Sequence, residues 1–194
     1  MMIRTEALKA IAEHRGDAIV VAVYSTAFEW IGIAPHPLNF LAVGAMGQAS
    51  SNGLGFAIGL PEKDVIVFDG DGSLLMNLGA LVTVAEEAPQ NLTHFVAQNG
   101  CYEANGEHPI PGRNQVNFAG MARSAGYPTV EEFSDVEDLR AKLPAFLAKP
   151  GPRFATLHIT AGEKPQLDYA LVHGEAARKR FEAAISEELD RYGL

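Results

Sequence analysis

Four apolar runs separated by helix-like segments are the strongest constraint on how this chain folds. The runs are "AIVVAVY" (18–24), "DVIVFD" (64–69), "LTHFVAQN" (92–99) and "RFATLHITA" (153–161). They are rich in β-branched and aromatic residues and apolar on both faces, which is typical of strands in a parallel sheet covered by helices on both sides. The alternation therefore predicts an α/β fold with a single doubly wound, mostly parallel sheet.

Helices are expected between and after these strands. We predict one near the N-terminus, with Ile3, Ala7, Leu8 and Ile11 on one face, others at 46–59, 73–88, 117–126, 134–149 and 175–189, and a further short strand at 39–43. Ser134 and Glu137 form an S-x-x-E capping box at the start of the helix at 134–149. The glycine-rich "GLGFAIG" (53–59) falls inside a predicted helix, which favours close helix packing over a dinucleotide site. No linker or repeat interrupts the chain, so a single domain over 1–194 is expected, ending in the amphipathic helix 175–189.

Composition excludes several classes of protein. Acidic residues outnumber basic ones, 24 to 15, which does not suit a nucleic-acid surface. Cys101 is the single cysteine, so this chain alone builds no disulfide framework and no cysteine-ligated zinc site. The charged N-terminal segment does not resemble a signal peptide, and no apolar run approaches the roughly 20 residues of a membrane helix. The sequence thus predicts a cytoplasmic protein that binds neither nucleic acid nor membrane.

Three loops with unusual chemistry follow predicted strands. They are "GAMG" (44–47), "GDGS" (70–73) and "NGCYEANG" (99–106). Ligands of open parallel sheets bind outside the carboxyl ends of the strands, so these loops are expected to meet at one binding site.

The acid–glycine turn points to a metal ion and an anion. Gly70 and Gly72 permit a tight turn, and the start of the following helix favours an anion. Asp71 has no lysine near it in the sequence, and a divalent cation such as Mg²⁺ would supply the positive charge. The amide oxygen of Asn99 and a loop carbonyl such as that of Cys101 are suitable further ligands. Taken alone, however, "GDGS" also fits an ordinary capped turn.

The combined motifs resemble the thiamine diphosphate enzymes, in particular the diphosphate-binding domain of the decarboxylase branch. That family carries Gly-Asp-Gly, then a spacer that ends in asparagine, as in "GDGSLLMNLGALVTVAEEAPQNLTHFVAQN" here. The segment "PLNFLAVGAMGQASSNGLGFAIGLP" is similar to the cofactor-facing part of sulfopyruvate decarboxylase small subunits and of phosphonopyruvate decarboxylase. The resemblance therefore implies the thiamine diphosphate-binding fold of the diphosphate-domain type.

The resemblance also implies roles for individual residues. Mg²⁺ is bound by Asp71, the side-chain oxygen of Asn99 and the backbone carbonyl of Cys101. The implied cofactor-binding residues are Gly44, Ala45, Met46, Gly70, Gly72, Ser73, Asn99, Cys101 and Tyr102. Among these, Met46 wedges the cofactor into its V shape, and the Gly44 carbonyl receives the amino group of the pyrimidine.

The implied reaction is non-oxidative decarboxylation of a small acidic 2-oxo acid, sulfopyruvate-like or phosphonopyruvate-like, to an aldehyde and CO₂. Besides Met46, the candidate catalytic residues are Glu103 and His108 in the loop after the third strand, although exposed loop residues of these types are commonly solvated surface. This loop departs from the family pattern, which leaves the substrate open. Carboligation of the acetolactate-synthase kind and a non-catalytic, cofactor-binding regulatory subunit are the alternatives.

A second subunit is expected. Enzymes of this family activate the cofactor with a glutamate from a pyrimidine-binding domain, and this chain holds only one α/β unit. We therefore expect a pyrimidine-domain partner subunit that supplies this glutamate, in a hetero-oligomer with two or more copies of each chain. The predicted helix 73–88 is apolar around most of its circumference, so it packs either on the sheet or on that partner.

Overall fold

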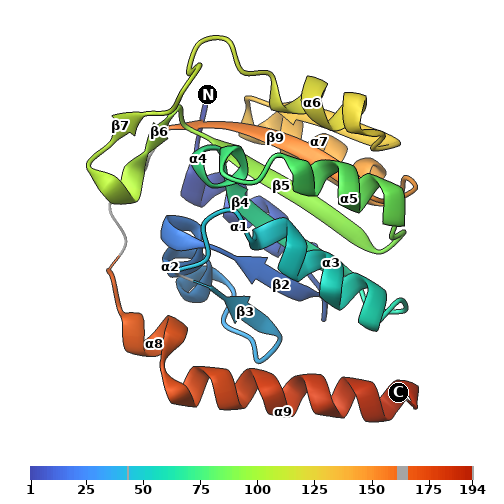
Figure 1. Cartoon of the computed structure of the whole chain (residues 1–194). Coiled ribbons are helices and arrows are strands. Elements are labelled where there is room, and N and C mark those ends of the chain that lie inside the picture. The colour runs from blue at the N-terminus through green and yellow to red at the C-terminus, as the bar shows by residue number, and fades with distance from the viewer. Residues whose placement is uncertain (43, 161–165, 194) are drawn as a thin grey trace.

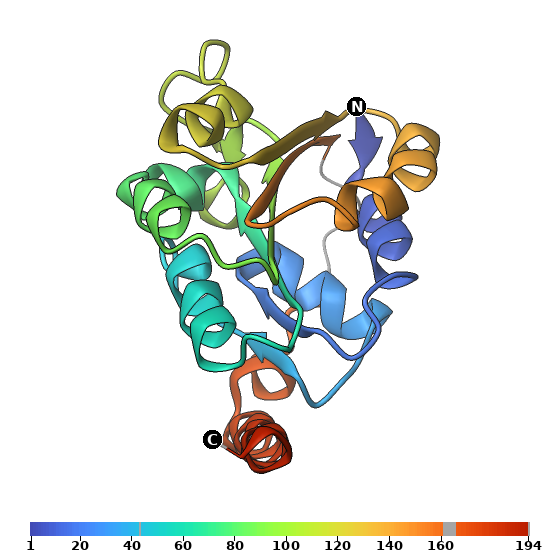
Figure 2. The ribbon, with the colours of Figure 1, turned by 90° about the vertical axis from the view of Figure 1, so that its right-hand side faces the viewer.

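The computed structural model describes residues 1–42, 44–160 and 166–193, which form a parallel sheet between layers of helices (Figures 1 and 2). The strands of this sheet are β1 (Met2–Ile3), β2 (Ile19–Ala22), β3 (Asn39–Leu41), β4 (Val65–Gly70), β5 (Leu92–Gln98), β8 (Thr129–Phe133) and β9 (Arg153–Thr160). Their order is β1-β9-β5-β4-β2-β3, and β8 pairs with β9 as well. Every strand pair of this sheet in the described ranges is parallel, so the predicted α/β fold with a parallel sheet is confirmed.

Helices cover both faces of the sheet, as Figure 2 shows. One face carries α1 (Arg4–Ala12), α2 (Tyr24–Ile33) and α7 (Val136–Leu147), and the other carries α3 (Ala49–Gly59), α4 (Asp71–Leu75), α5 (Gly79–Glu87) and α6 (Phe118–Ala125). Successive residues of β2 alternate between the two cores: Val20 and Ala22 join one, while Ile19 and Val21 join the other. This explains why the strand sequences are apolar on both faces.

Close packing explains one glycine of α3, Gly53. A Cβ atom on Gly53 would lie 2.2 Å from the Val67 side chain of β4, so only glycine permits this approach of helix and strand. The prediction that "GLGFAIG" lies within a helix is confirmed. Close packing accounts for Gly53 only, since a Cβ on Gly55 or Gly59 would meet no atom within 4 Å.

The C-terminal segment lies along the edge strand β3. It consists of α8 (Tyr169–His173) and α9 (Glu175–Tyr192), and α9 runs past the sheet edge in Figure 1. Phe181 of α9 packs against Phe40 and Phe56, with ring centroids 5.2 and 5.4 Å apart. Glu188 pairs at 2.9 Å with the buried Lys63, which anchors the far end of this charged helix. No helix in the three described ranges is both long and apolar enough to cross a membrane.

Two local predictions were wrong. The expected helix 73–88 is two helices, α4 and α5. The break falls at Asn77 and Gly79, which are both weak helix formers, and the Asn77 side chain donates a hydrogen bond to the carbonyl of Gly47. Helix α7 is capped not by Ser134 but by Asp135, whose carboxylate accepts hydrogen bonds from the backbone N–H groups of Glu137 and Asp138.

Ile3 was predicted on the apolar face of the first helix, but it lies in β1 and is exposed, and α1 begins at Arg4. Helices α2 and α8 and strand β8 went unpredicted. So did a short antiparallel hairpin of β6 (Cys101–Tyr102) and β7 (His108–Pro109), which encloses the 3-10 turn Glu103–Asn105. Helix α2 was missed because it follows β2 directly, without a capping side chain. The strands predicted at 39–43 and 153–161 end on residues 43 and 161, which lie outside the described residues.

Candidate active site

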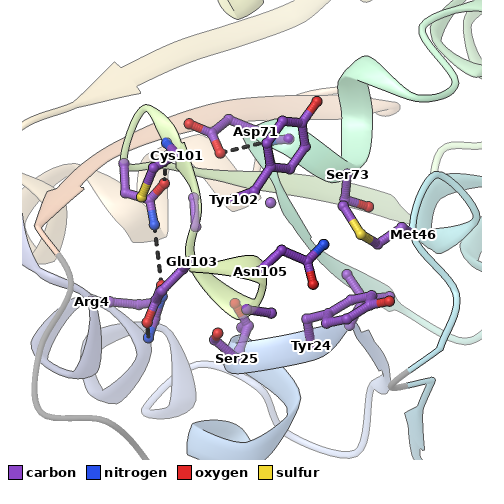
Figure 3. Close-up of a pocket in the computed structure, with 17 residues that line it drawn as sticks. Arg4, Tyr24, Ser25, Met46, Asp71, Ser73, Cys101, Tyr102, Glu103 and Asn105 are labelled. Carbon is purple, nitrogen blue, oxygen red and sulfur yellow. Dashed lines mark hydrogen bonds and ion pairs between the residues drawn. The ribbon is translucent and has the colours of Figure 1, made fainter. Parts of the chain in front are cut away.

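A pocket opens at the carboxyl ends of β2, β4 and β5 (Figure 3). Its wall combines the start of α2, the turn after β4 and the loop after β5. The predicted site residues that line it are Met46, Gly70, Asp71, Gly72, Ser73, Asn99, Cys101, Tyr102 and Glu103. Gly44, Ala45 and His108 do not line it, and His108 is exposed on β7.

Asp71 carries a buried carboxylate that has no basic side chain as a partner in the described part of the chain. It begins α4 and is 2% exposed, with Oδ1 accepting a 2.7 Å hydrogen bond from the backbone N–H of Gly72. Its Oδ2 accepts a 2.6 Å bond from the N–H of Gly100. Burial raises the pKa of Asp71 above its ordinary value, although these backbone bonds act in the opposite direction. Within the described residues no lysine, arginine or histidine forms an ion pair with it.

Asn99 and Cys101 lie beside this carboxylate. The side-chain oxygen of Asn99 accepts a 2.9 Å hydrogen bond from the N–H of Cys101, and its amide nitrogen donates to Oε2 of Glu103 at 3.1 Å. Burial, with smaller contributions from the charges of Asp71 and Glu103, raises the pKa of the Cys101 thiol. The thiol is therefore protonated at neutral pH, and it is not an activated nucleophile.

Tyr102 lies against the glycine of the turn. A Cβ atom on Gly72 would lie 2.6 Å from the Tyr102 ring, so the β6 hairpin closes over the turn only because residue 72 has no side chain.

Met46 lies at the end of the pocket away from Glu103, and its neighbour Gly47 is fixed by two hydrogen bonds. The N–H of Gly47 donates to the Ser73 hydroxyl oxygen at 2.9 Å, and its carbonyl accepts from the Asn77 amide at 2.9 Å. Gly47 has a φ of +77°, a value that favours glycine. Figure 3 shows Met46 and Ser73 at one end of the pocket, with Arg4 and Glu103 at the other.

Arg4 is the main site residue that the sequence did not indicate. Its side chain is 4% exposed and forms ion pairs with both Glu29 of α2 and Glu103. No spacing or motif connects residue 4 with residue 103, so only the folded chain brings them together.

The start of α2 was also missed. Tyr24, Ser25 and Thr26 line the pocket, and Tyr24 has an unusual φ of +49°. A usable signal existed, because Tyr24 ends the apolar run at 18–24 and Ser25 and Thr26 follow it directly, just as the three predicted loops follow their strands. Asn105, in the 3-10 turn, lines the pocket as well.

The donor set fits Mg²⁺ rather than a transition metal. In the described part of the chain, no three His, Cys, Asp or Glu side chains gather around a common metal position. One buried carboxylate, one amide oxygen and backbone carbonyls are hard oxygen donors, and Mg²⁺ bound to phosphate uses few protein ligands of this kind. The uncompensated negative charge of Asp71 is what such an ion would balance.

Comparison with known proteins agrees with this chemistry. Residues 21–157 match the family described as "Thiamine pyrophosphate enzyme, C-terminal TPP binding domain". The chain belongs to this family. Thiamine pyrophosphate is another name for thiamine diphosphate, so the resemblance seen in the sequence is confirmed together with its cofactor.

Two decarboxylases are similar to this chain over most of its length. The chain is 35% identical to the sulfopyruvate decarboxylase subunit beta of Methanothermobacter thermautotrophicus, over 84% of each chain. It is 35% identical to a phosphonopyruvate decarboxylase of Streptomyces hygroscopicus, over 88% of this chain and 42% of that protein. This chain therefore spans less than half the length of that relative.

A solved structure supports the fold. The thiamine diphosphate-dependent 4-hydroxybenzoylformate decarboxylase of Rhodococcus jostii RHA1 superposes with a TM-score of 0.68, at 20% identity, over 82% of this chain and 33% of that one. At this level of identity the similarity concerns the fold alone.

Proposed function

We propose that this chain is the small subunit of a two-subunit decarboxylase that depends on thiamine diphosphate and Mg²⁺. It acts without oxidation on a small acidic 2-oxo acid, sulfopyruvate-like or phosphonopyruvate-like, and gives an aldehyde and CO₂. The observation that carries the proposal is the convergence of Asp71, Asn99 and Met46 on one pocket, in a chain similar to a sulfopyruvate decarboxylase beta subunit over 84% of its length.

Each residue has a proposed task in holding the cofactor. Asp71, the Asn99 amide oxygen and the Cys101 carbonyl would bind Mg²⁺. The start of α4, with the Ser73 hydroxyl, would bind the diphosphate, because a helix N-terminus favours an anion. The Gly72 N–H, which donates to Asp71 in this structure, would be shared with the diphosphate. The other proposed contacts are Gly44, Ala45, Gly70 and Tyr102.

When bound, thiamine diphosphate supplies a carbon nucleophile and an electron sink for the loss of CO₂. Met46 would support its rings from the pocket wall, where Gly47 is fixed by Ser73 and Asn77. The Gly44 carbonyl would hold the pyrimidine amino group, although Gly44 does not line the pocket of this chain.

We propose that a pyrimidine-domain subunit completes the site. Its activating glutamate and an assembly with two or more copies of each chain remain proposals, supported by the beta-subunit relatives. Arg4 is the one cationic side chain among the described residues lining the pocket, and two carboxylates already pair with it. The distal acidic group of the substrate would therefore be recognised largely by the partner. A cytoplasmic location also stays a prediction.

Co-expression with a pyrimidine-domain subunit tests the proposal. The purified complex is supplied with Mg²⁺, thiamine diphosphate and a set of 2-oxo acids, and both CO₂ and the organic product are measured. We expect CO₂ and an aldehyde from a small acidic 2-oxo acid. A condensed hydroxy-oxo acid would instead support carboligation. Bound cofactor without turnover of any acid would support a regulatory subunit.

A further inference from the structure

We propose that Glu103 is a positioning residue that fixes the orientation of the Asn99 amide, so that the amide oxygen faces the Mg²⁺ site. Arg4 holds Glu103 in place for this task. The inference rests on the proposed function, since it takes Asn99 as a metal ligand.

Glu103 is clamped from the side of the pocket that faces α1 and α2. Arg4 donates Nη1–H to Oε2 and Nη2–H to Oε1 of Glu103, the latter at 3.0 Å. The same guanidinium binds Glu29 through Nε–H at 2.8 Å, and Thr5 donates its hydroxyl to Glu29 at 2.9 Å. Arg4 begins α1 and Glu29 lies in α2, so two helices anchor the carboxylate of Glu103.

The two ends of the Asn99 amide have different partners. A carboxylate is an acceptor only, so Oε2 of Glu103 must face the NH₂ group of Asn99, which it does at 3.1 Å. A backbone N–H is a donor only, so the Cys101 N–H must face the amide oxygen, at 2.9 Å. A flipped amide would place oxygen against the carboxylate and NH₂ against N–H. Both neighbours therefore select the orientation in which the oxygen is available to a metal.

This geometry favours positioning over proton transfer. Both carboxylate oxygens of Glu103 accept bonds from Arg4, and one also accepts from Asn99. A general acid or base needs an oxygen free to reach the substrate. Residues that orient metal ligands in this manner commonly change metal affinity or activity by 10–100-fold when mutated.

The test compares Glu103→Gln with Glu29→Gln in the complete complex with its partner subunit. Both carboxylates bind Arg4, and either variant leaves Arg4 one charged partner, so both are expected to fold. Only Glu103 touches Asn99. Mg²⁺ is titrated calorimetrically at saturating thiamine diphosphate, and the melting temperature is recorded for each variant.

We expect Glu103→Gln to weaken Mg²⁺ binding by about 10–100-fold. Glu29→Gln should lower the melting temperature to a similar extent but weaken Mg²⁺ binding far less, because Arg4 still binds both oxygens of Glu103. Equal Mg²⁺ affinities in the two variants would overturn the inference.

Repeating the test in an Asn99→Asp variant separates an effect on the orientation of residue 99 from an effect on general packing. In Asn99→Asp, an oxygen faces the metal whichever way the group turns, but its carboxylate now repels Glu103. Glu103→Gln should then improve Mg²⁺ binding in this background, although it weakens binding in the wild type. The same fold loss in both backgrounds would show a structural role only. A wild-type complex without Mg²⁺-dependent cofactor binding would instead refute the proposed function itself.

Discussion

The Asp71 carboxylate accepts a 2.6 Å hydrogen bond from the backbone N–H of Gly100, and this contact joins the ends of β4 and β5. The two neighbours of Gly100 are the other proposed Mg²⁺ ligands, Asn99 and Cys101. A single bond thus brings the three ligand-bearing residues together before any metal binds. Preorganisation of this kind reduces the conformational cost of metal binding.

Loss of the Asp71 charge should abolish Mg²⁺-dependent cofactor binding. Asp71→Asn keeps the size of the side chain but removes the charge that would balance the ion. We expect no measurable Mg²⁺-dependent binding of thiamine diphosphate to the complex that carries it. Undiminished affinity would remove Asp71 from the metal site.

The same residue predicts a pH dependence of stability in the metal-free chain. Burial raises the pKa of Asp71 in the folded state, so the folded state binds this proton more tightly than the unfolded state. The contribution of Asp71 to stability therefore improves as the pH falls through the raised folded-state pKa, and the gain is complete once the pH lies below the ordinary value of 3.8. Denaturant unfolding across this pH range should show that gain in wild type and lose it in Asp71→Asn. Saturating Mg²⁺ and cofactor should suppress it, since the cation stabilises the carboxylate.

Gly72→Ala should disturb the β6 hairpin. The new Cβ would lie 2.6 Å from the Tyr102 ring, and we expect destabilisation of about 1–3 kcal/mol together with weaker cofactor binding. Gly79→Ala is the matched control, because a Cβ there meets no atom within 4 Å. That variant should keep its stability or gain up to about 1 kcal/mol, since alanine favours a helix more than glycine does. Equal losses in the two variants would contradict the packing explanation.

Asn77 should affect the cofactor through Gly47. Asn77→Ala removes the bond to the Gly47 carbonyl, and we expect a loss of about 1 kcal/mol in stability and weaker thiamine diphosphate binding. Asn77→Asp should be worse than alanine at neutral pH, because a carboxylate cannot donate to that carbonyl and repels it. Calorimetric titration measures the thiamine diphosphate affinity of both variants. A higher affinity in Asn77→Asp than in Asn77→Ala would show that the Asn77 bond does not hold the loop at Gly47.

The Cys101 thiol should be dispensable. Its proposed role is carried by the backbone carbonyl, so Cys101→Ala should keep Mg²⁺ affinity and turnover close to wild type. Asn99→Ala, which removes a side-chain ligand, should weaken Mg²⁺ binding strongly. A large loss of turnover in Cys101→Ala would indicate that the sulfur itself takes part.

The parts of the site that could be predicted are those that follow strands. Asp71 closely follows one apolar run and Asn99 ends another, and the rule that parallel strands end at one edge of the sheet predicts that the two lie together. Arg4 could not be found in this way, because its ion pair with Glu103 joins residues 99 positions apart that share no periodic pattern. The break between α4 and α5 was equally hidden, since it depends on a tertiary bond from Asn77 to Gly47.

The same distinction holds for the fold. Buried strands such as β4 consist mainly of consecutive apolar residues. Strand β8, "TVEEF", instead contains glutamates that are at least partly exposed, and among the described strands it pairs with β9 alone. A strand of this kind has no distinctive pattern. Its position is set by its pairing with β9 in the folded sheet.

Mixing separately purified subunits tests the central claim most directly. This chain and a pyrimidine-domain subunit are each assayed alone and then together, with Mg²⁺, thiamine diphosphate and the best 2-oxo acid, and CO₂ release is recorded. We predict that CO₂ release appears only in the mixture and disappears when this chain carries Asp71→Ala. Turnover that is unchanged by Asp71→Ala, or that either subunit shows alone, would contradict an active site built between the two chains.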